Sequence, residues 1–479
     1  DKYETGKEFP RIAEITLETS EDGRYVLASV ANGDGGEFAH LLRDPSGKWR
    51  QITRFDDQVK LARFGRETRN GGENALYLIS RKGAPRGTVL RLPLPHASLA
   101  NATLIVPESG VVIDHLEPAA GGIYIEDMDG GPSGLRFYNL ASKKQTRLPV
   151  QGIISVQQML SPRGNELLFR TISFIDPYVW NEYVPGAGRK SVRPTQMRGT
   201  SPADFSDVEV VRKFATSKDG TKVPLNIIRK KGTRLNGQNP TLLTGYGGYG
   251  VSRAPNFDFT RRLWLDQGGV FVVANIRGGG EYGEAWHRAG NLTRKQNVFD
   301  DFAACAEYLI REKYTNPNKL AIEGGSNGGL LMGALFTQHP ALMRAVVSHV
   351  GIYDMLRVEL DPNGAFNVTE FGTVKNPEQF KALYAYSPYH HVTNGVPYPA
   401  VLMLTGEHDG RVNPAQSRKM TARLQAATSS NHPILLRTSA SSGHGIGTAL
   451  NERIAQLADV YAFLFDQLGI QLKNTGELQ

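Results

Sequence analysis

The sequence contains a single cysteine, Cys305. One thiol cannot build an internal disulfide framework or a cysteine-based metal site. Long apolar runs are also missing, because no stretch approaches the roughly 18 consecutive apolar residues of a membrane-spanning helix. No targeting pattern opens the sequence. We therefore expect a globular, soluble protein of the cytoplasm, or of the periplasm if an upstream signal peptide has been removed.

Charge of one sign is not concentrated anywhere, although the formal net charge is +8. The 55 Lys and Arg residues are scattered among 47 Asp and Glu residues. The longest basic cluster, Arg229-Lys230-Lys231, is too short to follow a phosphate backbone. We expect neither nucleic acid nor a membrane as a partner.

Residues 1–205 lack a convincing amphipathic helix, and short β-rich runs alternate there with Gly, Asp, Asn and Pro turns. Segments of similar pattern recur about every 45 to 50 residues, the size of one propeller blade. These segments are Gly23–Leu27, Asn74–Leu78, Gly121–Ile125 and Asn165–Phe169. They predict an incomplete, propeller-like all-β domain of four blades, with a β-sandwich of coincidental spacing as the alternative.

Residues 206–479 follow a different pattern, in which apolar β-runs alternate with helical segments. The strands expected at 270–274, 319–322 and 400–404 are almost continuously apolar, and a helix is expected at 300–310. Alternation of this kind predicts an α/β domain whose parallel sheet is covered by helices on both faces.

Ser326 lies in Gly324-Gly325-Ser326-Asn327-Gly328-Gly329, between an expected strand and an expected helix over 330–337. Both outer glycines of the G-x-S-x-G pattern are present. This context is that of a nucleophile elbow, in which a tight strand-to-helix turn exposes the serine hydroxyl.

A serine nucleophile needs a base, and the base needs an acid to fix its tautomer. In α/β-hydrolases these residues follow in the order Ser, Asp, His. Asp409 follows the strand expected at 400–404, and His444 lies in a later Gly-rich loop. We assign Asp409 and His444 to these roles. Glu407 and His408 stand nearby as weaker alternatives.

Acyl transfer also requires hydrogen-bond donors for the developing oxyanion. One is expected from the backbone N–H of Asn327, the residue after the nucleophile. The second should come from the loop 245–250, as a backbone amide or as the Tyr246 hydroxyl. A metal site is not expected, since His390 and His391 have no third ligand at suitable spacing. No cofactor is required.

The loops 245–250 and 278–283 both fit G-x-G-x-x-G, which makes a dinucleotide-binding enzyme an alternative. The dinucleotide fingerprint expects a helix at its last glycine and an acidic residue closing the next strand. Here Gly250 is followed by Val251-Ser252-Arg253-Ala254-Pro255, and the next strand closes at Asn275. A non-enzymatic interaction module with a dead hydrolase domain is disfavoured because no member of the triad is missing.

With these residues in place, the second half resembles the prolyl oligopeptidase family of serine peptidases. The matching segments are Tyr246–Tyr249, Asn275–Gly283, Gly324–Leu331, Asp409–Val412 and Gly443–Gly445. The resemblance implies that the Tyr246 hydroxyl binds the oxyanion and that Arg411 binds a substrate carbonyl. It also implies a propeller that covers the active site and admits only short peptides.

The family's substrate pocket holds proline against a tryptophan, and Asn367 stands at that place here. The resemblance assigns Phe371, Ile352 and Tyr249 to other pocket positions, and Phe366 is the candidate for a substitute aromatic. The pocket is expected to stay apolar, while its preference for proline is open.

Family members are longer and carry a seven-bladed propeller, so we expect the chain to be a fragment of a longer protein, with a propeller reduced to fewer blades as the alternative. The resulting prediction is a monomeric serine endopeptidase that cleaves short peptides after proline. A peptidase with another preference at the residue before the cleaved bond, called P1, or an esterase on the same fold, is the alternative.

Overall fold

The computed structural model describes residues 4–34, 36–65, 75–94, 97–187, 191–445 and 447–472. Asn74, which opens the second sequence repeat, lies outside these ranges. The chain forms two compact units. The first comprises Asp1–Ser201, Ala254–Phe257 and Gly280–Ala285, and the second comprises Pro202–Arg253, Asp258–Gly279 and Trp286–Gln479.

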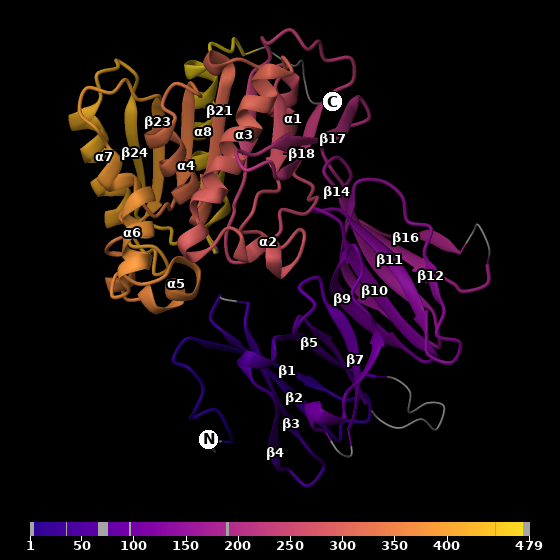
Figure 1. Cartoon of the computed structure of the whole chain (residues 1–479). Coiled ribbons are helices and arrows are strands. Elements are labelled where there is room, and N and C mark those ends of the chain that lie inside the picture. Colours follow the sequence, from indigo (N-terminus) through magenta and orange to yellow (C-terminus); the bar gives the residue numbers. More distant parts are fainter. Residues whose placement is uncertain are drawn as a thin grey trace. The chain divides into compact units, whose positions relative to one another are not determined.

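The described part of the first unit contains four antiparallel sheets, each of four strands that pair in chain order (Figure 1). Each sequence repeat contributes to the second strand of its sheet, at β2, β6, β10 and β14. The predicted four blades are therefore confirmed, and the described residues of this unit do not form a two-sheet sandwich. The strands are β1 (Ala13–Thr19), β2 (Val26–Asn32), β3 (Phe38–Arg43), β4 (Trp49–Thr53), β5 (Val59–Phe64), β6 (Ala75–Ser80), β7 (Thr88–Pro93), β8 (Thr103–Val106), β9 (Val112–Ala119), β10 (Gly122–Met128), β11 (Ser133–Asn139), β12 (Gln145–Arg147), β13 (Ile154–Leu160), β14 (Leu167–Ser173), β15 (Val179–Tyr183) and β16 (Val192–Arg198).

Apolar side chains fill the space between neighbouring sheets of this unit. Strand β6 illustrates the arrangement, because all of its residues are buried. Leu76 and Leu78 pack in a core shared with the first sheet, whereas Tyr77 and Ile79 pack in a core shared with the third. Successive side chains of a strand point to opposite faces, so one strand contributes to two cores. A third core lies between the third and fourth sheets.

The second unit is built on an eight-stranded sheet in the order β17-β18-β20-β19-β21-β22-β23-β24. The last six strands in this order, which are β20, β19, β21, β22, β23 and β24, run parallel, as predicted. The first two strands differ from the prediction, because β17 and β18 form an antiparallel hairpin and β18 is antiparallel to β20. A tight turn closed by the bond from the Ser217 N–H to the Thr221 carbonyl reverses the chain there. The strands are β17 (Val208–Thr216), β18 (Lys222–Lys230), β19 (Thr241–Thr244), β20 (Val270–Ala274), β21 (Leu320–Gly325), β22 (Ala345–His349), β23 (Ala400–Gly406) and β24 (Ile434–Ser439).

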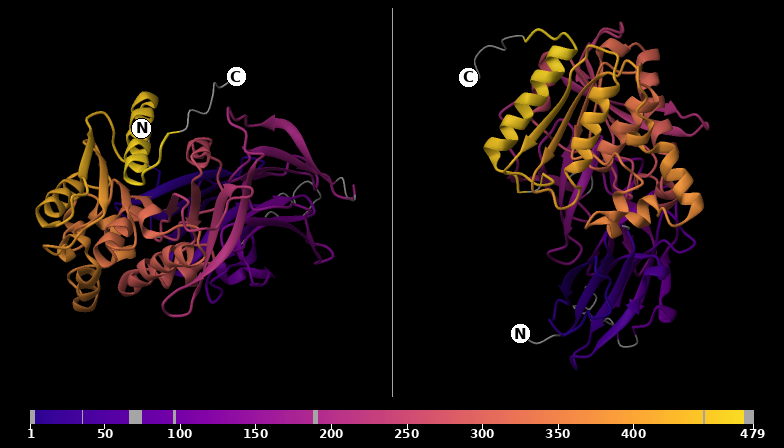
Figure 2. Two further views of the ribbon diagram at one scale, coloured as in Figure 1. Left: turned by 90° about the horizontal axis from the view of Figure 1, so that it is seen from above. Right: turned by 90° about the vertical axis from the view of Figure 1, so that its left-hand side faces the viewer.

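Helices cover both faces of this sheet, which is visible in Figure 2 with the yellow α8 on one side and orange helices on the other. In β21, Leu320 and Ile322 join the core beneath α3, α4 and α7, while Ala321 joins the core beneath α1 and α8. Among the described residues, no helix is both long and apolar enough to cross a membrane. The α-helices are α1 (Arg261–Asp266), α2 (Glu284–Arg288), α3 (Gln296–Arg311), α4 (Asn327–Gln338), α5 (Gly364–Phe371), α6 (Pro377–Tyr386), α7 (Ala415–Ala427) and α8 (Leu450–Gln467).

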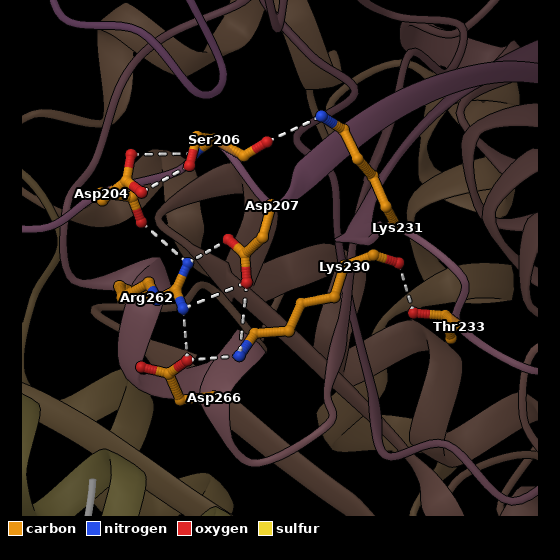
Figure 3. A network of polar contacts seen from close by, with 8 residues as sticks. All are labelled: Asp204, Ser206, Asp207, Lys230, Lys231, Thr233, Arg262 and Asp266. Carbon is orange, nitrogen blue, oxygen red and sulfur yellow. Dashed lines mark hydrogen bonds and ion pairs between the residues drawn. The ribbon is translucent and has the colours of Figure 1, made fainter. Parts of the chain in front are cut away.

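An ion-pair network binds the segment before β17 to helix α1 (Figure 3). Arg262 lies at its centre, with Nη1 2.5 Å from Asp207 Oδ1 and Nη2 2.8 Å from Asp266 Oδ1. Lys230 Nζ lies 2.6 Å from the same Asp266 oxygen. Arg262 also donates to the carbonyl of Asp204 over 2.7 Å. The network therefore connects the start of the second unit to strand β18 and helix α1.

Candidate active site

Ser326 lies between strand β21, which ends at Gly325, and helix α4, which begins at Asn327. Its φ of 57° and ψ of −120° are unusual for a non-glycine residue, and such a backbone persists only where its surroundings hold it. The Ser326 N–H donates to the His349 carbonyl over 2.8 Å, and the Gly329 N–H donates to the Ser326 carbonyl over 2.8 Å. The turn therefore has the strand-turn-helix geometry of a nucleophile elbow.

The glycines around Ser326 are required by close packing. A Cβ at Gly324 would lie 2.5 Å from the Gly328 carbonyl oxygen. A Cβ at Gly329 would lie 2.5 Å from the Cα of Gly351. Real side chains do not tolerate such distances, so the start of α4 approaches its neighbours only because these positions have no side chain.

Asp409 follows β23, and its carboxylate is held by three donors. Asp409 Oδ1 accepts hydrogen bonds from the backbone N–H groups of Arg411 and Val412, each over 2.9 Å. Asp409 Oδ2 lies 2.8 Å from Nδ1 of His444. The Asp409 side chain is fully buried, whereas the His444 side chain is 19% exposed. A buried carboxylate at Nδ1 favours the tautomer that leaves Nε2 able to accept a proton.

The three candidate triad residues follow neighbouring parallel strands. Ser326 follows β21, Asp409 follows β23 and His444 follows β24, and the sheet order runs from β21 through β22 to these two strands. Because parallel strands place their carboxyl ends at one edge, the three residues lie at the same edge of the sheet.

The alternatives considered from the sequence have other contacts. Glu407 lies 3.8 Å from Arg418 on the surface, so the carboxylate that faces His444 belongs to Asp409. His390 bonds to the Ser387 hydroxyl and His391 to the Tyr384 carbonyl. Within the described residues, no group of three or more metal-binding side chains is found.

The two expected oxyanion donors lie on adjacent segments. Asn327 is the first residue of α4, where backbone N–H groups have no acceptor within the helix. Its side-chain amide donates to the Tyr246 carbonyl over 2.6 Å and so binds the loop after β19. No helix follows Gly250 until α1 begins at Arg261, which does not match the dinucleotide fingerprint.

Three of the predicted pocket residues come together in the structure. The Tyr249 hydroxyl donates to Asn367 Oδ1 over 2.7 Å, and the Tyr249 ring meets Phe371 edge-on at 5.7 Å between centroids. Asn367 and Phe371 are one turn apart on α5. Ile352 is buried in the same core cluster as Phe371. Arg411 is exposed, and its backbone N–H binds Asp409.

A buried polar cluster beside these residues was missed by the sequence prediction. Lys295 Nζ lies 2.7 Å from Glu370 Oε1, and His287 Nε2 lies 2.8 Å from Glu370 Oε2. Burial lowers the pKa of Lys295, against the opposing effect of Glu370. Burial also favours neutral Glu370, but Lys295 and His287 outweigh it and lower the pKa of that carboxyl. The one sequence signal that could have revealed this cluster is the position of Lys295 at the amino end of α3, where the helix dipole disfavours a cation.

Comparison with family models gives two matches that together span most of the chain. Residues 5–196 match the model described as the prolyl oligopeptidase N-terminal β-propeller domain, and residues 255–471 match the model described as the prolyl oligopeptidase family.

Individual relatives agree with these matches. A prolyl endopeptidase of Elizabethkingia meningoseptica is 33% identical over 470 residues, covering 97% of this chain and 65% of the relative. A prolyl endopeptidase of Dictyostelium discoideum is 46% identical over 273 residues, covering 56% of this chain and 36% of the relative. The chain thus spans 65% of the length of the first of these curated relatives.

Solved structures share the fold. A chain from a study of two prolyl endopeptidases has a TM-score of 0.86 and 36% identity, covering 96% of this chain and 67% of its own. Prolyl oligopeptidase B of Galerina marginata, bound to a 35-residue hydrolysis and macrocyclization substrate, has a TM-score of 0.87 and 28% identity, covering 98% of this chain and 66% of its own.

Proposed function

Because the chain belongs to the prolyl oligopeptidase family, we propose that it is a serine peptidase that hydrolyses short peptides on the carboxyl side of proline. The observation that carries the proposal is the 2.8 Å contact between His444 Nδ1 and the buried Asp409 carboxylate. This pair is at the same sheet edge as the Ser326 elbow.

Hydrolysis proceeds in two steps. Ser326 Oγ attacks the peptide carbonyl carbon while His444 Nε2 accepts the hydroxyl proton, and the C–N bond then breaks as His444 returns this proton to the leaving amine. Water attacks the acyl-enzyme while His444 accepts its proton, and the ester C–O bond then breaks as His444 returns this proton to Ser326 Oγ, which releases the acid product. Asp409 accepts the Nδ1–H bond throughout and stabilises the imidazolium. The Tyr246 hydroxyl and the Asn327 N–H donate to the oxyanion in both steps.

In this proposal, substrate binding uses the remaining site residues predicted from the sequence. Arg411 donates to a peptide carbonyl, and Tyr249, Ile352 and Phe371 supply apolar surface for the P1 side chain. Burial of an apolar ring such as that of proline against aromatic surface stabilises the bound substrate. Two relatives of this chain are prolyl endopeptidases, which supports the same P1 residue.

The hydrogen bond between Tyr249 and Asn367 favours a second candidate, a peptidase with a broader P1 preference. An amide at this position offers a polar contact in place of an apolar face. A small or polar P1 residue would then be accepted as readily as proline. An esterase on the same fold is the remaining alternative.

Labelling and turnover together test the proposal. A fluorophosphonate probe should modify the chain covalently, and Ser326→Ala should abolish the labelling. In a panel of anilides that differ only in P1, kcat/KM should be higher for Pro than for Ala or Phe. The Pro-linked anilide should also be hydrolysed faster than a simple acyl ester, which separates a peptidase from an esterase. Labelling that persists in Ser326→Ala would overturn the nucleophile, and equal kcat/KM for Pro, Ala and Phe would favour the broader peptidase.

A further inference from the structure

The side chain of Lys295 is only 1% exposed, although it carries an ammonium group. Burying a cation is unfavourable unless polar partners replace its water. Lys295 Nζ has two such partners, the Glu370 carboxylate at 2.7 Å and the Gly247 carbonyl at 2.9 Å. These partners come from helix α5 and from the loop after β19, which are far apart in the sequence.

Glu370 is equally buried and completes the cluster. Its side chain is 1% exposed, and its second oxygen lies 2.8 Å from His287 Nε2. The carboxylate therefore contacts one partner with each oxygen, which fixes the orientation of the α5 backbone that carries it.

The Gly247 end of the cluster adjoins the proposed oxyanion donor. Gly247 follows Tyr246 directly, has a φ of +69°, and is packed so tightly that a Cβ would lie 2.3 Å from Val298 Cγ1 of α3. Lys295 thus binds the carbonyl of a loop residue that is already pressed against the first turn of the same helix. Lys295 therefore holds the residue next to Tyr246, and the Tyr246 carbonyl itself accepts a hydrogen bond from the Asn327 side chain.

The Glu370 end adjoins the proposed P1 pocket. Phe371 is the next residue, and Lys295 Nζ lies 5.2 Å from the centre of its ring. Asn367, three residues before Glu370 on α5, accepts the Tyr249 hydrogen bond. One buried cation therefore contacts both the loop that bears Tyr246 and Tyr249 and the helix that bears Asn367 and Phe371.

We infer that Lys295 is a positioning residue, whose ammonium sets the loop of Tyr246 against helix α5 so that the Tyr246 hydroxyl is aimed at the oxyanion. This inference rests on the proposed function. Lys295 itself touches no reacting atom in this scheme. Its effect on turnover passes through Tyr246, and this dependence separates a positioning role from a purely structural one.

A double-mutant cycle tests the dependence. Lys295→Met should lower kcat for the Pro-linked anilide by about 10²-fold, the order expected when a reacting group is misplaced by about 1 Å. In a Tyr246→Phe background, where the donor hydroxyl is already absent, the same substitution should lower kcat by less than about threefold, since the two residues act through one interaction. Equal losses in both backgrounds would overturn the inference.

Lys230→Met is the matched control, because it makes the same substitution at a lysine paired with Asp266 in the network of Figure 3. It should lower the melting temperature while changing kcat by less than about twofold. If Lys295→Met does not accumulate as folded protein, Glu370→Gln carries the same test, since it keeps the shape of the side chain and removes its charge. An unchanged kcat in that variant would overturn the inference.

The fluorophosphonate probe separates the two proposals. A wild-type chain that is neither labelled nor active would overturn the proposed function together with the role of Lys295. A wild-type chain that is labelled and active, combined with unchanged kcat in Lys295→Met, would overturn the role of Lys295 alone.

Discussion

The Tyr249 hydroxyl donates a 2.7 Å hydrogen bond to the side-chain oxygen of Asn367. This bond joins the loop after β19 to helix α5, and both side chains are half-buried. The neighbouring Phe371 and Ile352 are almost completely buried and apolar. The proposed P1 pocket therefore has one polar contact in walls that are otherwise apolar.

Asn367→Trp should increase selectivity for proline at P1. An indole would replace the amide with an aromatic face, and aromatic packing adds about 0.5 to 1.5 kcal/mol beyond simple burial. The ratio of kcat/KM for Pro over Ala should rise by about 2- to 12-fold. A P1-varied anilide panel on both proteins measures this ratio. An unchanged ratio would show that α5 does not contact the P1 side chain, and a falling ratio would show that the indole does not favour proline.

Asp409→Asn should lower kcat by about 10⁴-fold with little change in KM, because an amide at this position favours the wrong His444 tautomer. Steady-state kinetics and the rate of fluorophosphonate labelling measure the loss. Glu407→Gln is the matched control, and its kcat should stay within about twofold of wild type. The opposite pattern would assign the acid to Glu407.

Arg262→Met should lower the free energy of unfolding by about 1 kcal/mol, since Arg262 connects Asp207 and Asp266 at a partly exposed site (Figure 3). The difference from wild type should shrink at about 1 M salt, where the screening length falls to about 3 Å. Denaturant unfolding of both proteins at low salt and at about 1 M salt measures this difference. Arg311→Met, which removes one exposed pair with Glu312, should change stability by less than about 0.5 kcal/mol.

The same network should also respond to acid. The hydrogen bond from Arg262 lowers the pKa of Asp207 below its usual 3.8. An acid whose pKa is lower in the folded state stabilises that state above its unfolded pKa, and this contribution is lost as the pH falls through the folded value. Wild type should therefore lose more stability than Arg262→Met between about pH 5 and pH 2. Equal losses would show that the pair does not contribute.

Glu126→Gln should remove a pH dependence of the propeller domain. Burial raises the pKa of Glu126 to about 8, from 4.5 in an exposed chain. Between pH 4.5 and about pH 8 the folded state therefore keeps a proton on Glu126 that the unfolded chain has lost. Wild type consequently loses stability as the pH rises through this range. From about pH 5 to pH 8 the loss should reach about 3 kcal/mol more in wild type than in the variant. Parallel pH profiles of the two proteins would contradict the raised pKa.

Much of the fold followed from local patterns. The strand expected at 270–274 is β20, and the helix expected at 300–310 lies within α3. The Ser326 turn was predictable for the same reason, because an apolar strand, a glycine-flanked serine and a helical run are contiguous in the chain. Alternation of side chains and turn chemistry act over a few residues, and a sequence displays them directly.

Other features depend on which distant segments pack together. The antiparallel hairpin of β17 and β18 was not predicted, because an apolar run does not reveal the direction of its partner strand. The cluster of His287, Lys295 and Glu370 was also missed, since a charged residue shows its burial only once the surrounding elements are assembled.

The sequence by itself determined the two-part organisation, the elbow at Ser326, and the order in which a carboxylate and a histidine follow it. The sequence favoured Asp409 over Glu407 as the acid, and the tertiary structure decided the contact itself, because it places the Asp409 carboxylate against His444 and Glu407 beside Arg418. It also decided that Lys295 joins the Gly247 loop to α5. The physical reason is the same in both cases: these contacts connect residues on different elements, and their geometry is set by the register of the sheet and the packing of helices on it.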